Sequence, residues 1–200
     1  MLTDAELVLR ARQGHQEACR EIVVRFERPI YSLVARMLQD PAAAEDLAQE
    51  VFIKAFRRLD TYDPQRKFSS WLFKIAHNTT IDYLRRHTPE TVPLEAEKDG
   101  DHGSLSKVLA DGSAEDPAAG AERRDMARAL ERAIARLRPE YRESVVLFYL
   151  EGASYQEICE TTGLPLGTVK TNLHRARKEL AQHMTDLGWG PAETRDARAS

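Results

Sequence analysis

The sequence has few of the residues that build cross-linked or metal-bound proteins. It contains two cysteines, Cys19 and Cys159, far apart and without Cys or His neighbours at ligand spacing. We therefore expect neither a disulfide framework nor a metal site. Each cysteine sits among apolar helical positions, which favours a small core residue in a reducing, cytoplasmic setting.

Long apolar runs are also missing. No segment approaches the roughly 18 consecutive apolar residues of a membrane helix. The first residues, MLTDAELVLRARQG, carry early acids and no continuous apolar segment. A signal peptide and membrane insertion are therefore not expected.

The sequence lacks the short motifs of common enzymes. It has no His-Glu-x-x-His pattern, no glycine-rich phosphate loop and no pair of carboxylates in an evident cleft. We therefore predict a binding protein rather than an enzyme, with no catalytic residue and no cofactor.

The acidity of the chain lies in one segment. The net charge is −3, yet residues 89–120 alone hold eight acidic and two basic side chains, with prolines, glycines and serines. This composition predicts a flexible acidic linker, which is either a passive tether or a segment that docks in a partner's channel. It separates helical domains over residues 1–88 and 121–186, and residues 187–200 read as a disordered tail.

Helical periodicity recurs on both sides of this linker, and no alternating strand pattern is convincing. The fold class is therefore all-α, with two small helical domains. Asp40 with Pro41 predicts one helix start, and Ser69 or Ser70 another. Helices are expected over residues 4–13, 16–38, 40–59, 68–87, 121–137 and 139–152.

Residues 154–180, SYQEICETTGLPLGTVKTNLHRARKEL, have the spacing of a helix-turn-helix. Ser154 and Glu157 form a capping-box pattern that starts the first helix. Gly163 can end it in a left-handed conformation, and Pro165 presets the first turn of the second. Leu164 falls at the expected N-cap of that second helix.

The second helix has an apolar and a cationic face. The apolar stripe consists of Leu166, Val169, Leu173, Ala176 and Leu180; the opposite face consists of Thr171, His174, Arg175 and Lys178, with Lys170 at its edge. Such a face can neutralise phosphates and reach base edges. The alternative is a surface helix with solvated charges.

The segment AEDLAQEVFIKAF also has two faces. One is apolar (Ala44, Leu47, Ala48, Val51 and Ala55, continued by Leu59), and the other carries Asp46, Gln49, Glu50 and Ile53. An exposed isoleucine among acidic and amide groups suits a partner surface, although plain solvent exposure is the alternative.

The segment FSSWLFKIAHN, which begins at Phe68, mixes aromatic with basic side chains. Aromatics at helical spacing are more often core than base-stacking platforms, and we expect Trp71, Leu72 and Ile75 to pack inward. A separated DNA strand nevertheless needs a cationic track and a pocket for an unstacked base. Both uses remain open at this stage.

Taken in order, these three segments resemble bacterial sigma factors of the extracytoplasmic-function type, over residues 5–88 and 121–182. The resemblance implies a factor that binds core RNA polymerase, recognises minus-10 and minus-35 promoter elements about two helical turns apart and promotes melting of promoter DNA. It implies polymerase contacts at Asp46, Gln49 and Glu50. It also implies an anti-sigma factor as a further partner, although no residue here identifies one.

The resemblance and the residue patterns together give three predicted sites. The polymerase site is Asp46, Gln49, Glu50 and Ile53; the minus-10 site is Lys67, Phe68, Trp71, Lys74, His77 and Asn78; the minus-35 site is Lys170, Thr171, His174, Arg175 and Lys178. A helix-turn-helix regulator that works without polymerase is the alternative. It would leave residues 1–88 without a role.

Overall fold

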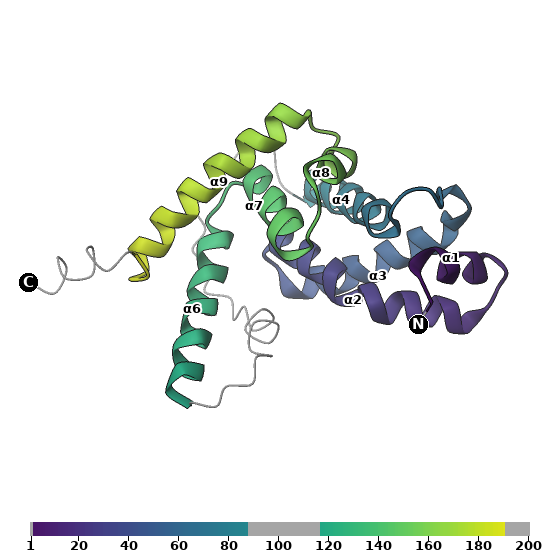
Figure 1. Cartoon of the computed structure of the whole chain (residues 1–200), viewed down its shortest axis with the longest axis horizontal. Helices are drawn as coiled ribbons and strands as arrows, with labels where there is room; N and C mark the ends of the chain where they lie inside the picture. The colour runs from purple at the N-terminus through teal and green to yellow at the C-terminus, as the bar shows by residue number, and fades with distance from the viewer. Residues whose placement is uncertain (1, 88–116, 191–200) are drawn as a thin grey trace, which may run out of the picture.

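The computed structural model describes residues 2–87 and 117–190. Within these two ranges every regular element is a helix, which confirms the all-α class (Figure 1). No helix of the described ranges is long and apolar enough to cross a membrane. The elements are α1 (Asp4–Arg12), α2 (Gln16–Leu38), α3 (Pro41–Arg57), η1 (Leu59–Thr61), α4 (Phe68–His87), α6 (Pro117–Ala135), α7 (Pro139–Val145), η2 (Val146–Leu150), α8 (Tyr155–Thr162) and α9 (Leu166–Asp186).

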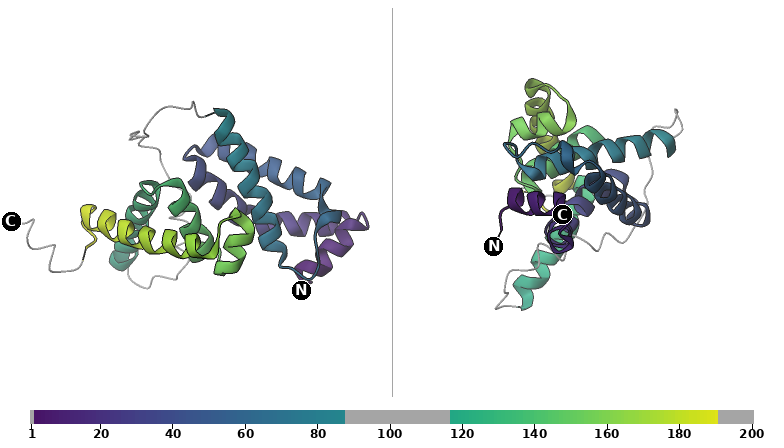
Figure 2. Two further views of the ribbon diagram at one scale, coloured as in Figure 1. Left: turned by 90° about the horizontal axis from the view of Figure 1, so that it is seen from above. Right: turned by 90° about the vertical axis from the view of Figure 1, so that its right-hand side faces the viewer.

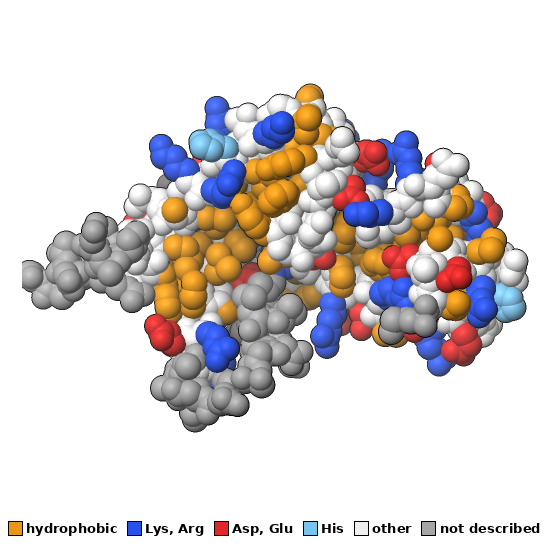
Figure 3. All heavy atoms as spheres, viewed as in Figure 1, with side chains coloured by type: hydrophobic (Ala, Val, Ile, Leu, Met, Phe, Trp, Pro, Cys, Tyr) orange, Lys and Arg blue, Asp and Glu red, His pale blue; other side chains and the backbone are white. Residues whose placement is uncertain are grey.

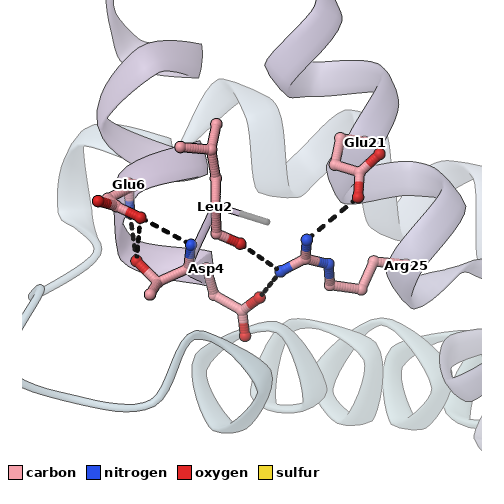
Figure 4. Close-up of polar contacts among 6 residues, drawn as sticks. Leu2, Asp4, Glu6, Glu21 and Arg25 are labelled. Atoms are coloured by element: carbon pink, nitrogen blue, oxygen red, sulfur yellow. Dashed lines mark hydrogen bonds and ion pairs between the residues drawn. The ribbon is translucent and has the colours of Figure 1, made fainter.

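The N-terminal helices pack around α2, which contacts α1, α3 and α4. Its apolar stripe, including Ile22, Ile30 and Leu33, is almost fully buried. The guanidinium of Arg25 fastens the start of the chain to α2, donating to the carbonyl oxygen of Leu2 and pairing with Asp4 and Glu21 (Figure 4).

Two predicted helix starts differ in outcome. The Asp40 carboxylate accepts hydrogen bonds from the first backbone N–H groups of α3, as predicted. Helix α4 begins at Phe68 instead of after Ser69 or Ser70. The reason is aromatic packing, because Phe68 is buried against Phe26 and Tyr62 at ring-centroid distances of 5.4 and 5.3 Å and draws the first turn inward.

The C-terminal helices also depart from the sequence reading at two places. Helix α6 begins at Pro117, inside the segment predicted as linker, because Pro is well suited to the first turn of a helix. The helix predicted over residues 139–152 consists of α7 and the wider π-helical turn η2, after which Gly152 turns the chain at a φ of 66°. The rest of the predicted linker, residues 89–116, and the predicted tail from residue 191 onward lie outside the described residues.

The helix-turn-helix geometry confirms most of its predicted caps. The capping box of Ser154 and Glu157 is complete, and Gly163 ends α8 at a φ of 75°. The start of α9 needs a correction: Pro165, not Leu164, is the N-cap residue, and it offers no side-chain cap. The N–H of Leu164 instead donates to the hydroxyl of Thr162 at 3.3 Å, which keeps that residue in the turn.

The two helical halves pack against each other. Helix α8 lies against α4, and α7 with η2 lies against α2 (Figures 1 and 2). One apolar core runs through both halves, from Ile30 and Leu33 of α2 to Val146 and Leu147 of η2. The sequence reading treated the halves as separate domains and did not predict this packing.

Buried polar groups fix the same contact. The guanidinium of Arg36 in α2 pairs with Glu131 of α6 at 3.0 Å. The guanidinium of Arg142 in α7 donates to four backbone carbonyl oxygens, two at the end of α6, one in the α6–α7 turn and that of Arg36 in α2. Burial lowers the pKa of Arg142 to about 10, so the group stays charged at neutral pH and holds the turn to the end of α2.

Candidate nucleic-acid interface

Helix α9 exposes a continuous cationic face. Val169, Leu173 and Ala176 are buried on its inner side, and Leu180 is half-buried. Leu166 is the exception to the predicted stripe, since it is 43% exposed at the first turn. Basic side chains follow the outer side of α9 (Figure 3). The five predicted minus-35 residues, Lys170, Thr171, His174, Arg175 and Lys178, are all exposed.

Arg175 lies near the middle of this face. Its Nη1 lies 3.5 Å from the hydroxyl of Tyr141 in α7, and this hydrogen bond raises the pKa of Arg175. The neighbouring Thr171 donates its hydroxyl to the carbonyl oxygen of Gly167 at 2.8 Å. The Arg175 fork is therefore oriented yet remains accessible, whereas the hydroxyl of Thr171 is already engaged within the helix.

The predicted minus-10 residues divide into three groups along α4. Lys67, Lys74 and Asn78 are exposed, and Trp71 and His77 are half-buried. The side chain of Phe68 is only 2% exposed and packs against Trp71, with ring centroids 5.5 Å apart, so in this structure it belongs to the core.

Carboxylates of the C-terminal half occupy part of this surface. Lys67 Nζ lies 2.8 Å from Glu157 of α8, and His77 Nδ1 lies 2.5 Å from Glu143 of α7. Burial by itself raises the pKa of Glu157, but hydrogen bonds from Lys67 and Ser154 leave that pKa below its usual value. Two predicted minus-10 residues thus face acidic side chains.

The predicted polymerase site forms one outer face of α3. The inner side of this helix is buried, as predicted, while Asp46 and Gln49 are exposed and Glu50 is half-buried. Glu50 pairs with Lys54 at 2.7 Å, and Ile53 leaves 52% of its surface exposed. The result is an apolar side chain beside acidic and amide groups, an arrangement suited to a protein contact.

Family models match both halves of the chain. Sigma-70 region 2 matches residues 22–90, and sigma-70 region 4 matches residues 127–180. The chain belongs to the extracytoplasmic-function group of the sigma-70 family. This sigma factor is therefore a transcription initiation factor that recognises promoters, and not an enzyme.

The similarity to named relatives extends over nearly the whole length of this sigma factor. It is 39% identical to the ECF RNA polymerase sigma factor SigW of Bacillus subtilis, over 90% of this chain and 96% of that protein. It is 33% identical to the ECF RNA polymerase sigma-E factor of Escherichia coli K12, over 93% and 96%. Among solved structures, CnrH in complex with the cytosolic domain of CnrY aligns with a TM-score of 0.62 and 25% identity, over 92% of this chain and 97% of that one.

Sequence reasoning missed the residues that join the halves. Arg36 and Glu131 each interrupt an apolar stripe, and this interruption was the one available signal. Glu143 lies among polar helix positions, Glu157 was predicted as part of a cap only, and Glu151, which accepts a hydrogen bond from the Ser32 hydroxyl of α2, follows an apolar run. Their role depends on which helix faces them, which no local pattern specifies.

Proposed function

We propose that this sigma factor binds core RNA polymerase through α3, reads the minus-35 element with α9 and reads and opens the minus-10 element with α4. The observation that carries this proposal is that α3 and α9 each have a buried apolar side, with Leu166 and Leu180 at its margins in α9, and an opposite polar face at the residues implied by the family resemblance. The compartment we propose is the cytoplasm, where polymerase and promoter DNA are found.

For the minus-35 element, the proposal assigns base contacts to Arg175 and phosphate neutralisation to Lys170 and Lys178. An exposed arginine fork can donate two hydrogen bonds to the O6 and N7 atoms of guanine, whereas an ammonium group acts as a point charge. The exposed ring of His174 lies one residue from Arg175 and completes the face that would lie along the groove.

For the minus-10 element, the proposal assigns contacts to Lys67, Trp71, Lys74, His77 and Asn78. Exposed lysines supply a cationic track for a single strand, and the half-buried Trp71 supplies an aromatic surface. Asn78 is exposed and offers both a donor and an acceptor for a base edge.

An anti-sigma factor is the further partner that we propose. The protein CnrH is known in complex with the cytosolic domain of CnrY, and a sigma factor RpoE is known in complex with the anti-sigma factor NepR from Bartonella quintana. The second resemblance, at 20% identity, bears on the fold alone. The proposal of an anti-sigma partner for this chain thus rests on its family, and no contact among the residues that the structure describes identifies the partner.

Reversing one charge on α3 tests the proposal. Asp46→Arg should weaken binding to core polymerase about tenfold or more, because an exposed acid at the centre of the face becomes repulsive. Glu27→Arg, an exposed reversal on α2, is the matched control and should leave binding within about twofold. Both are measured by fluorescence titration of labelled chain with core polymerase, followed by transcription from a mapped promoter.

The outcomes separate the two candidate functions. Promoter-specific transcription that is lost with Asp46→Arg and kept with Glu27→Arg supports the initiation factor. Undiminished polymerase binding by Asp46→Arg, together with tight promoter binding by the chain alone, would instead support a regulator that acts without polymerase.

A further inference from the structure

One arginine joins helix α1 to the short helix η1. Arg12, the last residue of α1, donates from Nε and Nη2 to the carbonyl oxygen of Leu59 at 3.0 and 2.7 Å, and from Nη2 to the carbonyl oxygen of Tyr62. Its guanidinium also lies over the Tyr62 ring, 5.9 Å from the ring centroid. Arg12 therefore fixes the backbone at both ends of η1.

Tyr62 extends this contact to the start of α4. The residue is buried, and its ring packs against the rings of Phe68 and Trp71 at centroid distances of 5.3 and 5.7 Å. Its hydroxyl donates to the carbonyl oxygen of Arg66 at 2.6 Å. A single side chain thus contacts both the loop before α4 and the first turn of that helix.

The loop itself, residues 63–67, is a turn closed by its own hydrogen bonds. The N–H of Gln65 donates to the Asp63 carboxylate at 2.9 Å, and the N–H of Arg66 donates to the Asp63 carbonyl oxygen at 3.0 Å. The ion pairs of Arg66 and Lys67 with α8 hold exposed side chains. The Tyr62 hydroxyl instead holds the backbone of the loop, directly before Lys67.

Neither Arg12 nor Tyr62 is placed to touch DNA itself. Tyr62 is buried, and the side chain of Arg12 is 22% exposed with its donors directed at backbone oxygens. Yet they hold the backbone before Lys67 and the ring of Trp71, both proposed contacts of the minus-10 strand. A cation and a stacking surface bind a flexible strand more tightly when they are already fixed, because less freedom is lost on binding.

We infer that Arg12 and Tyr62 are positioning residues for the minus-10 element, which hold residues 63–67 and the Trp71 ring in the arrangement that receives the separated strand. Helix α1 thereby takes part in promoter recognition without contacting DNA. The inference rests on the proposed function of α4 and adds the residues that make its surface rigid.

The first experiment removes one hydroxyl. Tyr62→Phe keeps the buried ring and loses the bond to Arg66, so the complex with core polymerase should bind a single-stranded oligonucleotide spanning the minus-10 element of a mapped promoter about fivefold more weakly. Its preference over an oligonucleotide of scrambled order should fall by a similar factor, while polymerase binding stays unchanged. Tyr31→Phe, at a half-buried tyrosine of α2, is the matched control and should stay within about twofold. Fluorescence anisotropy measures both.

The second experiment keeps the charge of Arg12 and removes its fork. Arg12→Lys should weaken binding of the same oligonucleotide about fivefold, because an ammonium group cannot reproduce the planar donor set that reaches two carbonyl oxygens. Arg10→Lys, at an exposed arginine of the same helix, is the control. Full binding by Arg12→Lys would show that positive charge alone acts here, and it would overturn the positioning role.

A third measurement reports on the ring of Trp71 directly. The sequence has two tryptophans, Trp71 and Trp189, so Trp189→Phe leaves Trp71 as the sole emitter in the free chain. Acrylamide should quench this emission more readily with Tyr62→Phe or Arg12→Lys than with the two controls. Weaker strand binding without the change in quenching would mean that the two residues act by another route, which overturns the inference.

A strand-contact variant separates the inference from the proposed function. Lys74 is exposed on α4, and Lys74→Ala should weaken binding of the oligonucleotide about threefold through a lost phosphate contact. A loss with Lys74→Ala and none with Tyr62→Phe overturns the inference and leaves the minus-10 role of α4 intact. No loss with Lys74→Ala rejects that role, and with it the inference.

Discussion

At the scale of single residues, Arg175 and Lys178 are one helical turn apart on α9 and have different chemistry. Both side chains are exposed, but only Arg175 is oriented by a neighbour, the hydroxyl of Tyr141. An oriented fork suits a base pair, and a solvated ammonium suits a phosphate. The two positions therefore form a natural pair for testing how the promoter is read.

Arg175→Ala should weaken binding of the polymerase complex to its promoter by about 1–3 kcal/mol and relax the preference for one base pair of the minus-35 element. Lys178→Ala should weaken binding to all promoter variants alike and reduce the salt dependence. The measurement is a titration of the complex against promoters that differ by single base pairs. An equal loss on every sequence with Arg175→Ala would show that this side chain contacts phosphate alone.

At the scale of secondary-structure elements, the turn between α8 and α9 depends on one backbone conformation. Gly163 adopts a φ of 75°, where a side chain is strained, although open space surrounds the position of its missing Cβ. Gly167 lies inside α9 with equally open surroundings and no positive φ. Because a Cβ would meet no atom at either position, substitutions at the two glycines report on backbone conformation without steric overlap.

Gly163→Ala should lower the free energy of unfolding by roughly 1 kcal/mol, because alanine disfavours the left-handed region. Gly167→Ala should raise it by roughly 0.5–1 kcal/mol, because glycine within a helix costs conformational entropy. Urea unfolding followed by circular dichroism measures both. Equal effects of the two substitutions would show that the turn does not depend on the conformation of Gly163.

The elements themselves were largely predictable from the sequence. Periodic apolar residues located the helices, and short local patterns such as Asp40 with Pro41 or Ser154 with Glu157 located their starts, because caps involve residues three or four positions apart. The errors at Phe68 and Leu164 arose where tertiary packing or a proline displaced the start. Local sequence predicts that a helix forms, but it does not show whether a contact with a distant part of the chain will shift the residue at which the helix begins.

The polar faces of the candidate sites could also be predicted from the sequence, because the helix positions outside a buried apolar stripe form the exposed face. The pairing of Lys67 and His77 with carboxylates could not be predicted. These partners lie far along the chain from α4, and nothing in either local sequence reports the distance between them. Phe68 shows the same limit, because an aromatic residue at a helix start suits a core as well as a base contact.

At the scale of the whole molecule, buried acids connect stability to pH. Burial raises the pKa of Glu131, with Arg36 opposing the shift, and burial raises the pKa of Glu151 against a hydrogen bond from Ser32. Burial also lowers the pKa of Arg36, so desolvation exceeds the attraction within the Arg36–Glu131 pair. Both carboxylates bind protons more readily in the folded chain than in the unfolded one.

The contribution of these two acids to the free energy of unfolding should therefore increase as pH falls from neutral through their raised pKa values towards about 4.3, the usual pKa of glutamate in an unfolded chain. The double variant Glu131→Gln, Glu151→Gln should lack this contribution. Urea unfolding at pH 7 and pH 5.5 tests it by comparing the change in the two proteins. An identical change in both would contradict the assignment.

The apolar core shared by α2 and η2 has a calorimetric consequence. Separating the halves would expose apolar surface to water and raise the heat capacity of the system. Docking on polymerase buries apolar surface and lowers it. The two contributions have opposite signs, so any separation of α2 from η2 during assembly would make the heat-capacity change understate the area of the final interface.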